Sequence, residues 1–108
     1  MSVAIDLSGK DAVVTGASQG LGAAAARVLH AAGCRVALNH PGVEQTTADA
    51  EAIAGELNAT RADSARAIAC DVSDADAVQA MMAGLKEDWG GIDFLINNAG
   101  IIRDRTIT

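Results

Sequence analysis

Four short apolar runs alternate with three longer segments of helical periodicity, and this alternation most limits what the chain can fold into. The runs are Asp11–Thr15, Arg35–Asn39, Arg66–Cys70 and Ile92–Asn97. A strand followed by a helix and a second strand forms a βαβ unit, whose strands are parallel. Right-handed crossovers then give the strand order 3-2-1-4. We predict an α/β fold, the first half of a doubly wound parallel sheet with helices on both faces.

Residues that commonly start or stop a helix mark the helical segments. The first segment is rich in alanine, runs to about Ala32 and is closed by Gly33. The second carries apolar residues between Val43 and Leu57, and its end is the least defined boundary. The third is predicted to begin at Ser73 as N-cap, with acidic residues in its first turn. Its apolar stripe, at helical spacing, is predicted to belong to the core: Val78, Met81, Met82, Leu85 and Trp89.

Length, charge and hydropathy exclude several classes of protein. The 108 residues fit one small domain. A net charge of −6 argues against a protein that binds nucleic acid by neutralising phosphates. No apolar run approaches the ~18 residues of a membrane span, and the start of the chain lacks the pattern of a secretory signal. We therefore expect a cytoplasmic protein with neither nucleic acid nor membrane as partner.

The cysteines and one histidine are interpreted as structural residues. Cys34 starts the second strand and Cys70 ends its parallel neighbour, so they should lie at opposite ends of the sheet. We predict two small buried side chains without a disulfide. Two cysteines are too few for a metal cluster, and no metal site is predicted. His30, in the middle of the first helix, is predicted to lie on the surface.

Three glycines between the first strand and the first helix predict a phosphate-binding turn. With Gly16, Gly20 and Gly22 the bare backbone turns tightly and approaches a pyrophosphate closely. The first free N–H groups of the helix would face that pyrophosphate, and Ser18 adds a hydroxyl. A plain strand-to-helix turn is the alternative interpretation of the same glycines.

Two motifs resemble those of the classical short-chain dehydrogenases/reductases. Residues 15–22, Thr-Gly-Ala-Ser-Gln-Gly-Leu-Gly, resemble the family's Thr-Gly-x-x-x-Gly-x-Gly, and residues 97–100 resemble its Asn-Asn-Ala-Gly. The stretch Ile96–Asp104 is especially similar to the 3-oxoacyl-thioester reductases of that family. The resemblance covers nearly the whole chain, and it implies a Rossmann fold that binds a nicotinamide dinucleotide.

The resemblance also implies which residues contact the cofactor. Five residues of the glycine turn would hold the pyrophosphate: Gly16, Ser18, Gly20, Leu21 and Gly22. The pair that closes the third strand would hold the adenine: Asp71 and Val72. Three residues of the second motif and the residue after it would hold the ribose on the nicotinamide side: Asn98, Ala99, Gly100 and Ile101. Asn97 is expected to be structural, because an Asn that ends a buried strand usually serves its hydrogen bonds.

The choice between NAD and NADP depends on residues near the end of the second strand. An acidic residue there accepts from the ribose 2′-OH of NAD, whereas a cation favours the 2′-phosphate of NADP. The resemblance adds Gln19, Asn39 and His40 to the expected cofactor contacts. His40 stands where NAD-preferring members have Asp, and Gln19 stands where many NADP-preferring members have Arg or Lys. Without a carboxylate to repel the phosphate, we expect NADP, with NAD as the alternative. The alternative for His40 is a solvated loop histidine before Pro41.

The activity implied by the resemblance is hydride transfer between NAD(P)H and a carbonyl, with Tyr, Lys, Ser and Asn as catalytic residues. The chain contains no tyrosine, and neither Lys10 nor Lys86 stands in a Tyr-x-x-x-Lys motif. No catalytic residue is therefore assigned.

We expect residues 1–108 to be the cofactor-binding half of a longer single-domain reductase, inactive alone. The parent enzyme is expected to be a homo-oligomer that reduces a small-molecule or carrier-bound carbonyl, a 3-oxoacyl thioester. The alternative is a complete, non-catalytic nucleotide-binding or regulatory module.

Overall fold

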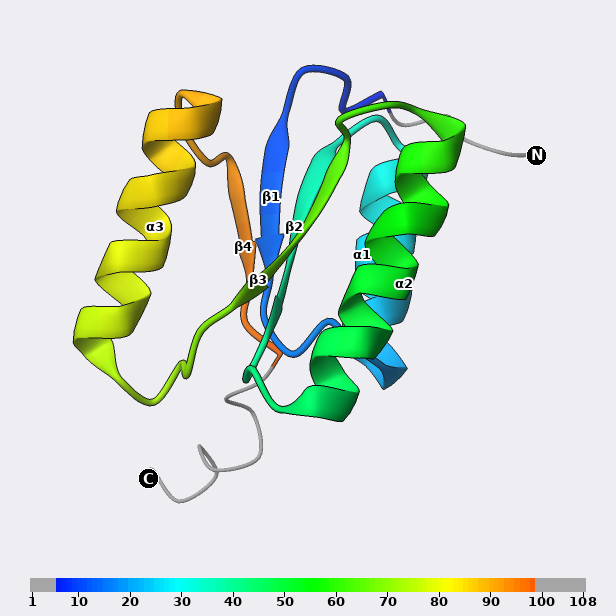
Figure 1. The fold of residues 1–108 in the computed structure, drawn as a ribbon. Helices are drawn as coiled ribbons and strands as arrows, with labels where there is room; N and C mark the ends of the chain where they lie inside the picture. Colours follow the sequence, from blue (N-terminus) through cyan, green and yellow to red (C-terminus); the bar gives the residue numbers. More distant parts are fainter. Residues whose placement is uncertain (1–5, 99–108) are drawn as a thin grey trace, which may run out of the picture.

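The computed structural model describes residues 6–98, which form one parallel sheet with helices on both faces (Figure 1). The strands are β1 (Asp11–Val14), β2 (Arg35–His40), β3 (Ala65–Ala69) and β4 (Phe94–Ile96). The helices are α1 (Gly20–Ala31), α2 (Glu44–Thr60) and α3 (Ala75–Trp89). The observed strand order is β3-β2-β1-β4, which confirms the predicted fold class and order. None of these helices is long and apolar enough to cross a membrane.

The sheet separates two hydrophobic clusters, because alternate side chains of each strand point to opposite faces. Figure 1 shows α1 and α2 on one face and α3 on the other. Toward α1 and α2 the central strands contribute Ala12, Val14, Val36 and Leu38. Toward α3 they contribute Val13 and Ala37, which pack with Met81 and Leu85. The rest of the α3 stripe, Val78, Met82 and Trp89, packs against this second cluster. The predicted core role of the stripe is confirmed.

The predicted N-cap of α3 is wrong by one residue. The Asp74 carboxylate caps the helix, because its Oδ1 accepts from the backbone N–H groups of Asp76 and Ala77 at 3.0 and 3.2 Å. Ser73 instead donates to Asp71 Oδ1 through its backbone N and its hydroxyl, at 2.9 and 2.6 Å. This local turn uses Ser73, so the chain enters the helix one position later.

Strand β4 is shorter and less covered than its apolar sequence predicts. It pairs with β1 over Phe94–Ile96 only, not over Ile92–Asn97. Phe94 packs against the cluster under α1 and α2, but Leu95 and Ile96 are 54% and 37% exposed. Among the residues that the structure describes, β4 lies at the edge of the sheet, so these two side chains are only partly covered.

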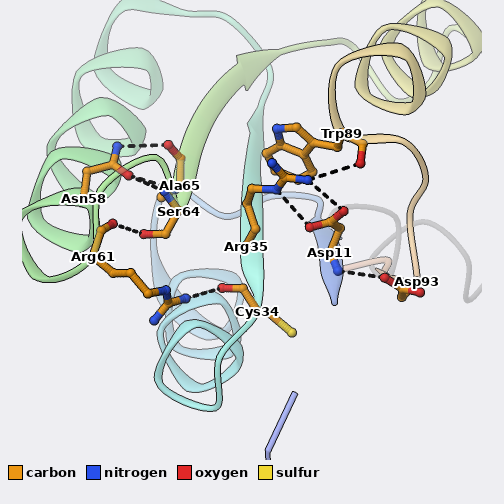
Figure 2. Close-up of polar contacts among 9 residues, drawn as sticks. All are labelled: Asp11, Cys34, Arg35, Asn58, Arg61, Ser64, Ala65, Trp89 and Asp93. Atoms are coloured by element: carbon orange, nitrogen blue, oxygen red, sulfur yellow. Dashed lines mark hydrogen bonds and ion pairs between the residues drawn. The ribbon is translucent and has the colours of Figure 1, made fainter. Parts of the chain in front are cut away.

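The predicted surface position of His30 is wrong. The ring is buried, with its Nε2 2.6 Å from the hydroxyl oxygen of Ser64. That hydroxyl donates to the carbonyl oxygen of Arg61, so His30 Nε2 carries the ring proton and donates to Ser64. The Arg61 guanidinium donates in turn to the carbonyl of His30 at 3.2 Å. It also donates to the carbonyl of Cys34 at 2.7 Å (Figure 2). These bonds join the end of α1 to the connection between α2 and β3.

A second polar cluster closes the edge of the sheet where the strands begin. Arg35 of β2 makes two hydrogen bonds to the Asp11 carboxylate, at 2.9 and 3.0 Å (Figure 2). Its guanidinium lies 4.4 Å from the ring centroid of Trp89 and donates to that residue's carbonyl at 3.2 Å. Asp93 Oδ2 accepts from the Asp11 backbone N at 2.8 Å. One cluster therefore connects β1, β2, the end of α3 and the start of β4.

Both cysteines are buried and free, as predicted. Cys34 precedes the first paired residue of β2, and Cys70 follows Ala69, which pairs with the last residue of β2. The two thiols therefore lie at opposite ends of the sheet. Burial raises the pKa of both, so they are protonated and unreactive at neutral pH.

Gly22 allows α1 to approach the end of β1. A Cβ at this position would lie 2.1 Å from the Gly16 carbonyl oxygen and 2.9 Å from Asn98 Nδ2. The two obstructing groups are themselves joined, because Asn98 Nδ2 donates to the Gly16 carbonyl at 3.3 Å. Only glycine therefore fits where the helix meets the turn.

We predict that Gly22→Ala lowers the free energy of unfolding by about 2 kcal/mol or more, because the methyl group displaces backbone atoms. Gly84→Ala is the matched control, since its Cβ would meet no atom within 4 Å on α3. It should raise stability by about 0.5–1 kcal/mol, the helix preference for Ala over Gly. Urea denaturation measures both, and a Gly22→Ala protein as stable as the wild type would contradict the packing described.

We predict that stability falls as the pH is lowered from about 6.5 toward 5. Burial, assisted by the positive charge of Arg61, lowers the pKa of His30. The unfolded chain then binds more protons, so the stabilisation is complete above the unfolded pKa of about 6.5 and is lost as pH falls through the folded pKa. His30→Gln should show a shallower slope in this range, and identical slopes would contradict the buried neutral ring.

Candidate functional site

A hollow of about 580 Å³ opens at the edge of the sheet where the strands end. Its lining comes from the residues that follow the strands and from one face of α3: Thr15, Gly16, Asn39, Pro41, Cys70, Asp71, Val72, Ser73, Val78, Met81, Met82, Leu95 and Asn97. Ligands of open α/β sheets bind at this edge, where crossovers run to opposite faces. The hollow is therefore the candidate binding site.

The glycine turn forms one wall of the hollow and is fixed by bonds to both neighbouring strands. Ala17 N donates to the Asn39 carbonyl of β2 at 2.9 Å, and Thr15 N donates to the Ile96 carbonyl of β4 at 3.0 Å. Gly16 and Gly20 have φ angles of 62° and 60°, a left-handed conformation that costs glycine little. The backbone of the turn is therefore held in one shape before any ligand arrives.

Helix α1 starts in this turn with a bare N-terminus. Within the described residues, the N-cap Gln19 makes no side-chain cap and the first turn holds no acidic residue. By contrast, α2 has Glu44 in its first turn and α3 is capped by Asp74. The first N–H groups of a helix lack intrahelical acceptors and favour an anion. Gly20 and Leu21, the first two residues of the helix, are exposed, so a phosphate can approach this end of the helix.

The two residues that end β2 point to opposite faces of the sheet. Asn39 is buried and lines the hollow. His40 is only 2% exposed, and its Nδ1 accepts from the Gly42 backbone N at 3.2 Å and lies 3.5 Å from the Thr47 hydroxyl on α2. The alternative of a solvated loop histidine is therefore wrong. Burial lowers the pKa of His40, although Glu51 opposes the shift, so the ring is neutral at pH 7.

The residues that follow β3 form a second wall. Asp71 is held by its bonds to Ser73, and Val72 beside it is half-buried. Val78 and Met82 of α3 continue this wall as an apolar surface. Opposite them, Asn97 Oδ1 accepts from the Thr15 hydroxyl at 3.2 Å, which agrees with the structural role expected of Asn97.

The structure brings together part of the predicted site. Four of the predicted residues line the hollow: Gly16, Asn39, Asp71 and Val72. Ser18 is buried in the turn, whereas Gln19, Gly20 and Leu21 are exposed beside it. The side chain of Asn98 is directed at Gly16, where it fixes the turn. Ala99, Gly100 and Ile101 lie outside the described residues.

Sequence reasoning missed several lining residues. They come from the loop after β2, from α3 and from β4: Pro41, Ser73, Val78, Met81, Met82 and Leu95. The available signal was the position of α3, which starts at Ala75, shortly after β3 ends at Ala69. Because α3 begins at the ligand-binding edge of the sheet, the apolar residues near its start line the hollow as well as pack in the core.

This arrangement suits an elongated ligand with an anionic group and a flat apolar group. The bare helix N-terminus accepts the anion, and the apolar surface of α3 accepts the flat group. Within residues 6–98, no group of three or more His, Cys, Asp or Glu side chains is placed to hold a metal ion. A phosphate-bearing nucleotide has both the anionic group and the flat group.

Comparisons with known proteins identify the family of this chain. A family model described as short chain dehydrogenase matches residues 10–108. A 3-oxoacyl-[acyl-carrier-protein] reductase of Staphylococcus aureus is 43% identical over 98 residues, which are 91% of this chain and 38% of the relative. A crystal structure of a metagenomic short-chain oxidoreductase in complex with NADP is 42% identical with a TM-score of 0.77, over 87% of this chain and 40% of that one.

A short chain dehydrogenase of Burkholderia cenocepacia, also in complex with NADP, is 40% identical with a TM-score of 0.78. The match covers 87% of this chain and 37% of that one. This chain therefore spans less than half the length of these relatives. Because the family model matches nearly every residue and the fold agrees, the chain belongs to the short-chain dehydrogenase family.

Proposed function

We propose that residues 1–108 form the NADP-binding half of a short-chain reductase. The observation that carries this proposal is the bare N-terminus of α1, set in a rigid glycine turn beside the hollow. The related metagenomic and Burkholderia structures are both complexes with NADP. The length that this chain spans, 38% of the Staphylococcus relative, supports a longer parent protein.

The residues present fit a dinucleotide. On this proposal the turn at Gly16–Gly22 holds the pyrophosphate, while Asp71, Val72 and the apolar face of α3 hold the adenine. Asn98 and the residues after it hold the nicotinamide ribose. The position of His40 lacks the carboxylate that would repel a 2′-phosphate, which favours NADP over NAD. When bound, the cofactor supplies the hydride.

The proposed substrate of the parent enzyme is a 3-oxoacyl thioester, reduced to its 3-hydroxyacyl form. Two observations support this class: the identity of 43% to the 3-oxoacyl-[acyl-carrier-protein] reductase, and the similarity of Ile96–Asp104 to such reductases. Residues 1–108 contain no tyrosine, so we assign the catalytic proton donor to the remaining part of the parent.

We predict that Gly20→Glu weakens binding of NADPH by about 100-fold or more. The substitution places a negative charge at the helix N-terminus, against the pyrophosphate. Gly20→Gln is the matched control, since it adds a side chain of the same shape at the same left-handed φ of 60° without the charge, and a Cβ there meets no atom within 4 Å. It should bind NADPH like the wild type in titration calorimetry. If Gly20→Glu binds NADPH as tightly as the control, the cofactor does not bind at the N-terminus of α1.

We predict that residues 1–108 bind NADPH but do not oxidise it in the presence of acetoacetyl thioester. A reductase needs a group that protonates the substrate oxygen, and the family's tyrosine is absent from this chain. Absorbance of NADPH measures turnover, and calorimetry on the same sample measures binding. Thioester-dependent oxidation by this chain alone would overturn the assignment of a cofactor-binding half.

A further inference from the structure

Asn39 is a buried amide in the wall of the hollow, with a relative exposure of 1%. Its Nδ2 is surrounded by acceptors. The carbonyl oxygen of Cys70 lies at 3.2 Å, and those of Ile68 and His40 lie at 3.4 Å. The thioether sulfur of Met81 lies at 3.8 Å.

These neighbours fix the orientation of the amide. A flipped side chain would bring the Asn39 Oδ1 against three carbonyl oxygens, which repel it, and would leave those carbonyls without this donor. An amide nitrogen has two hydrogens, and the surrounding carbonyls occupy both. Asn39 therefore has no donor left to offer to a ligand.

The remaining polar atom of the side chain is the acceptor Oδ1. In the described part of the chain no group donates to it. Among the described residues, every side-chain oxygen or nitrogen that is fully buried has a hydrogen-bond partner, so an atom without one has some accessible surface. Oδ1 is therefore not fully buried, and because Asn39 lines the hollow, the small exposed part of this side chain is assigned to the hollow. A polar atom held rigidly in such a wall selects ligands that donate a hydrogen bond to it.

We propose that Asn39 recognises the base of the cofactor. Its Oδ1 would accept a hydrogen bond from the 6-amino group of adenine, and a base with a 6-oxo group would bind more weakly. The inference rests on the proposed function. Asn39 lies next to Cys70 at the end of β3, beside the wall formed by Val72 and the apolar face of α3. A flat base against that wall presents its edge to Oδ1. An amino group there donates, whereas a carbonyl sets one acceptor against another.

The test compares NADPH with the reduced hypoxanthine analogue, in which an oxo group replaces the 6-amino group. Titration calorimetry gives both dissociation constants for the wild type, which should bind NADPH at least about tenfold more tightly. Asn39→Ala should bring the ratio close to one. Asn58→Ala is the control, because Asn58 makes three bonds of 2.8–3.0 Å to Ser64 and Ala65, at the opposite edge of the sheet. It should keep the wild-type ratio.

A second measurement needs no variant, in case Asn39→Ala fails to fold. Adenosine, purine riboside and inosine monophosphates compete with NADPH for the wild-type protein, and the expected order of affinity is 6-amino, then 6-hydrogen, then 6-oxo. Equal competition by the three, or a ratio that persists in Asn39→Ala, overturns the inference and leaves the proposed function standing. If the wild type binds neither dinucleotide, the proposed function fails, and the inference fails with it.

Discussion

The close approach of Gly22 to the carbonyl group of Gly16 is the contact on which the site depends. With no Cβ at Gly22, α1 begins almost in contact with the end of β1, and Asn98 ties the same carbonyl to the residues after β4. The start of the helix is thereby placed against Gly16, which lines the hollow. Any larger side chain would move the helix away from the turn, and the anion site would be lost together with the packing.

Polar groups at one edge of the sheet stabilise the fold, whereas polar groups at the opposite edge are available to bind a ligand. At the edge where the strands begin, polar groups pair with one another: Arg35 with Asp11 and the Trp89 ring, and Arg61 with the carbonyl of Cys34 (Figure 2). At the opposite edge, the bare N-terminus of α1 and the Asn39 Oδ1 have no such partners among the described residues. Groups that are held rigidly but left unpaired are suited to bind a ligand, because binding costs them little ordering.

The fold could be predicted because each strand and helix carries its own periodicity, and the handedness of crossovers leaves one strand order. Single side chains were harder to place. His30 follows Gly22 and Ala26 at intervals of four, so helical geometry puts all three on the buried face. This spacing indicates burial of His30, whereas its place in the middle of the helix alone does not. His40 follows Leu38 by two positions on β2, and this parity places it beneath α2 rather than in a loop.

Other features depend on competition between neighbours that sequence patterns do not resolve. Ser73 and Asp74 are both good N-caps, and the turn that Asp71 makes with Ser73 decides between them. The contribution of α3 to the hollow depends on which residues of its apolar stripe stay partly exposed, as Val78 and Met82 do. The orientation of Asn39 depends on carbonyl groups of β2 and β3, which become neighbours only once the sheet has formed.

Hydrogen exchange with and without NADPH tests the central claim most directly. The account predicts slower exchange in the presence of NADPH at the glycine turn, at the end of β2 and at residues 70–73. Exchange at the opposite edge, around Asn58 and Ser64, should not change. Protection confined to that opposite edge, or no protection anywhere at saturating NADPH, would contradict the account.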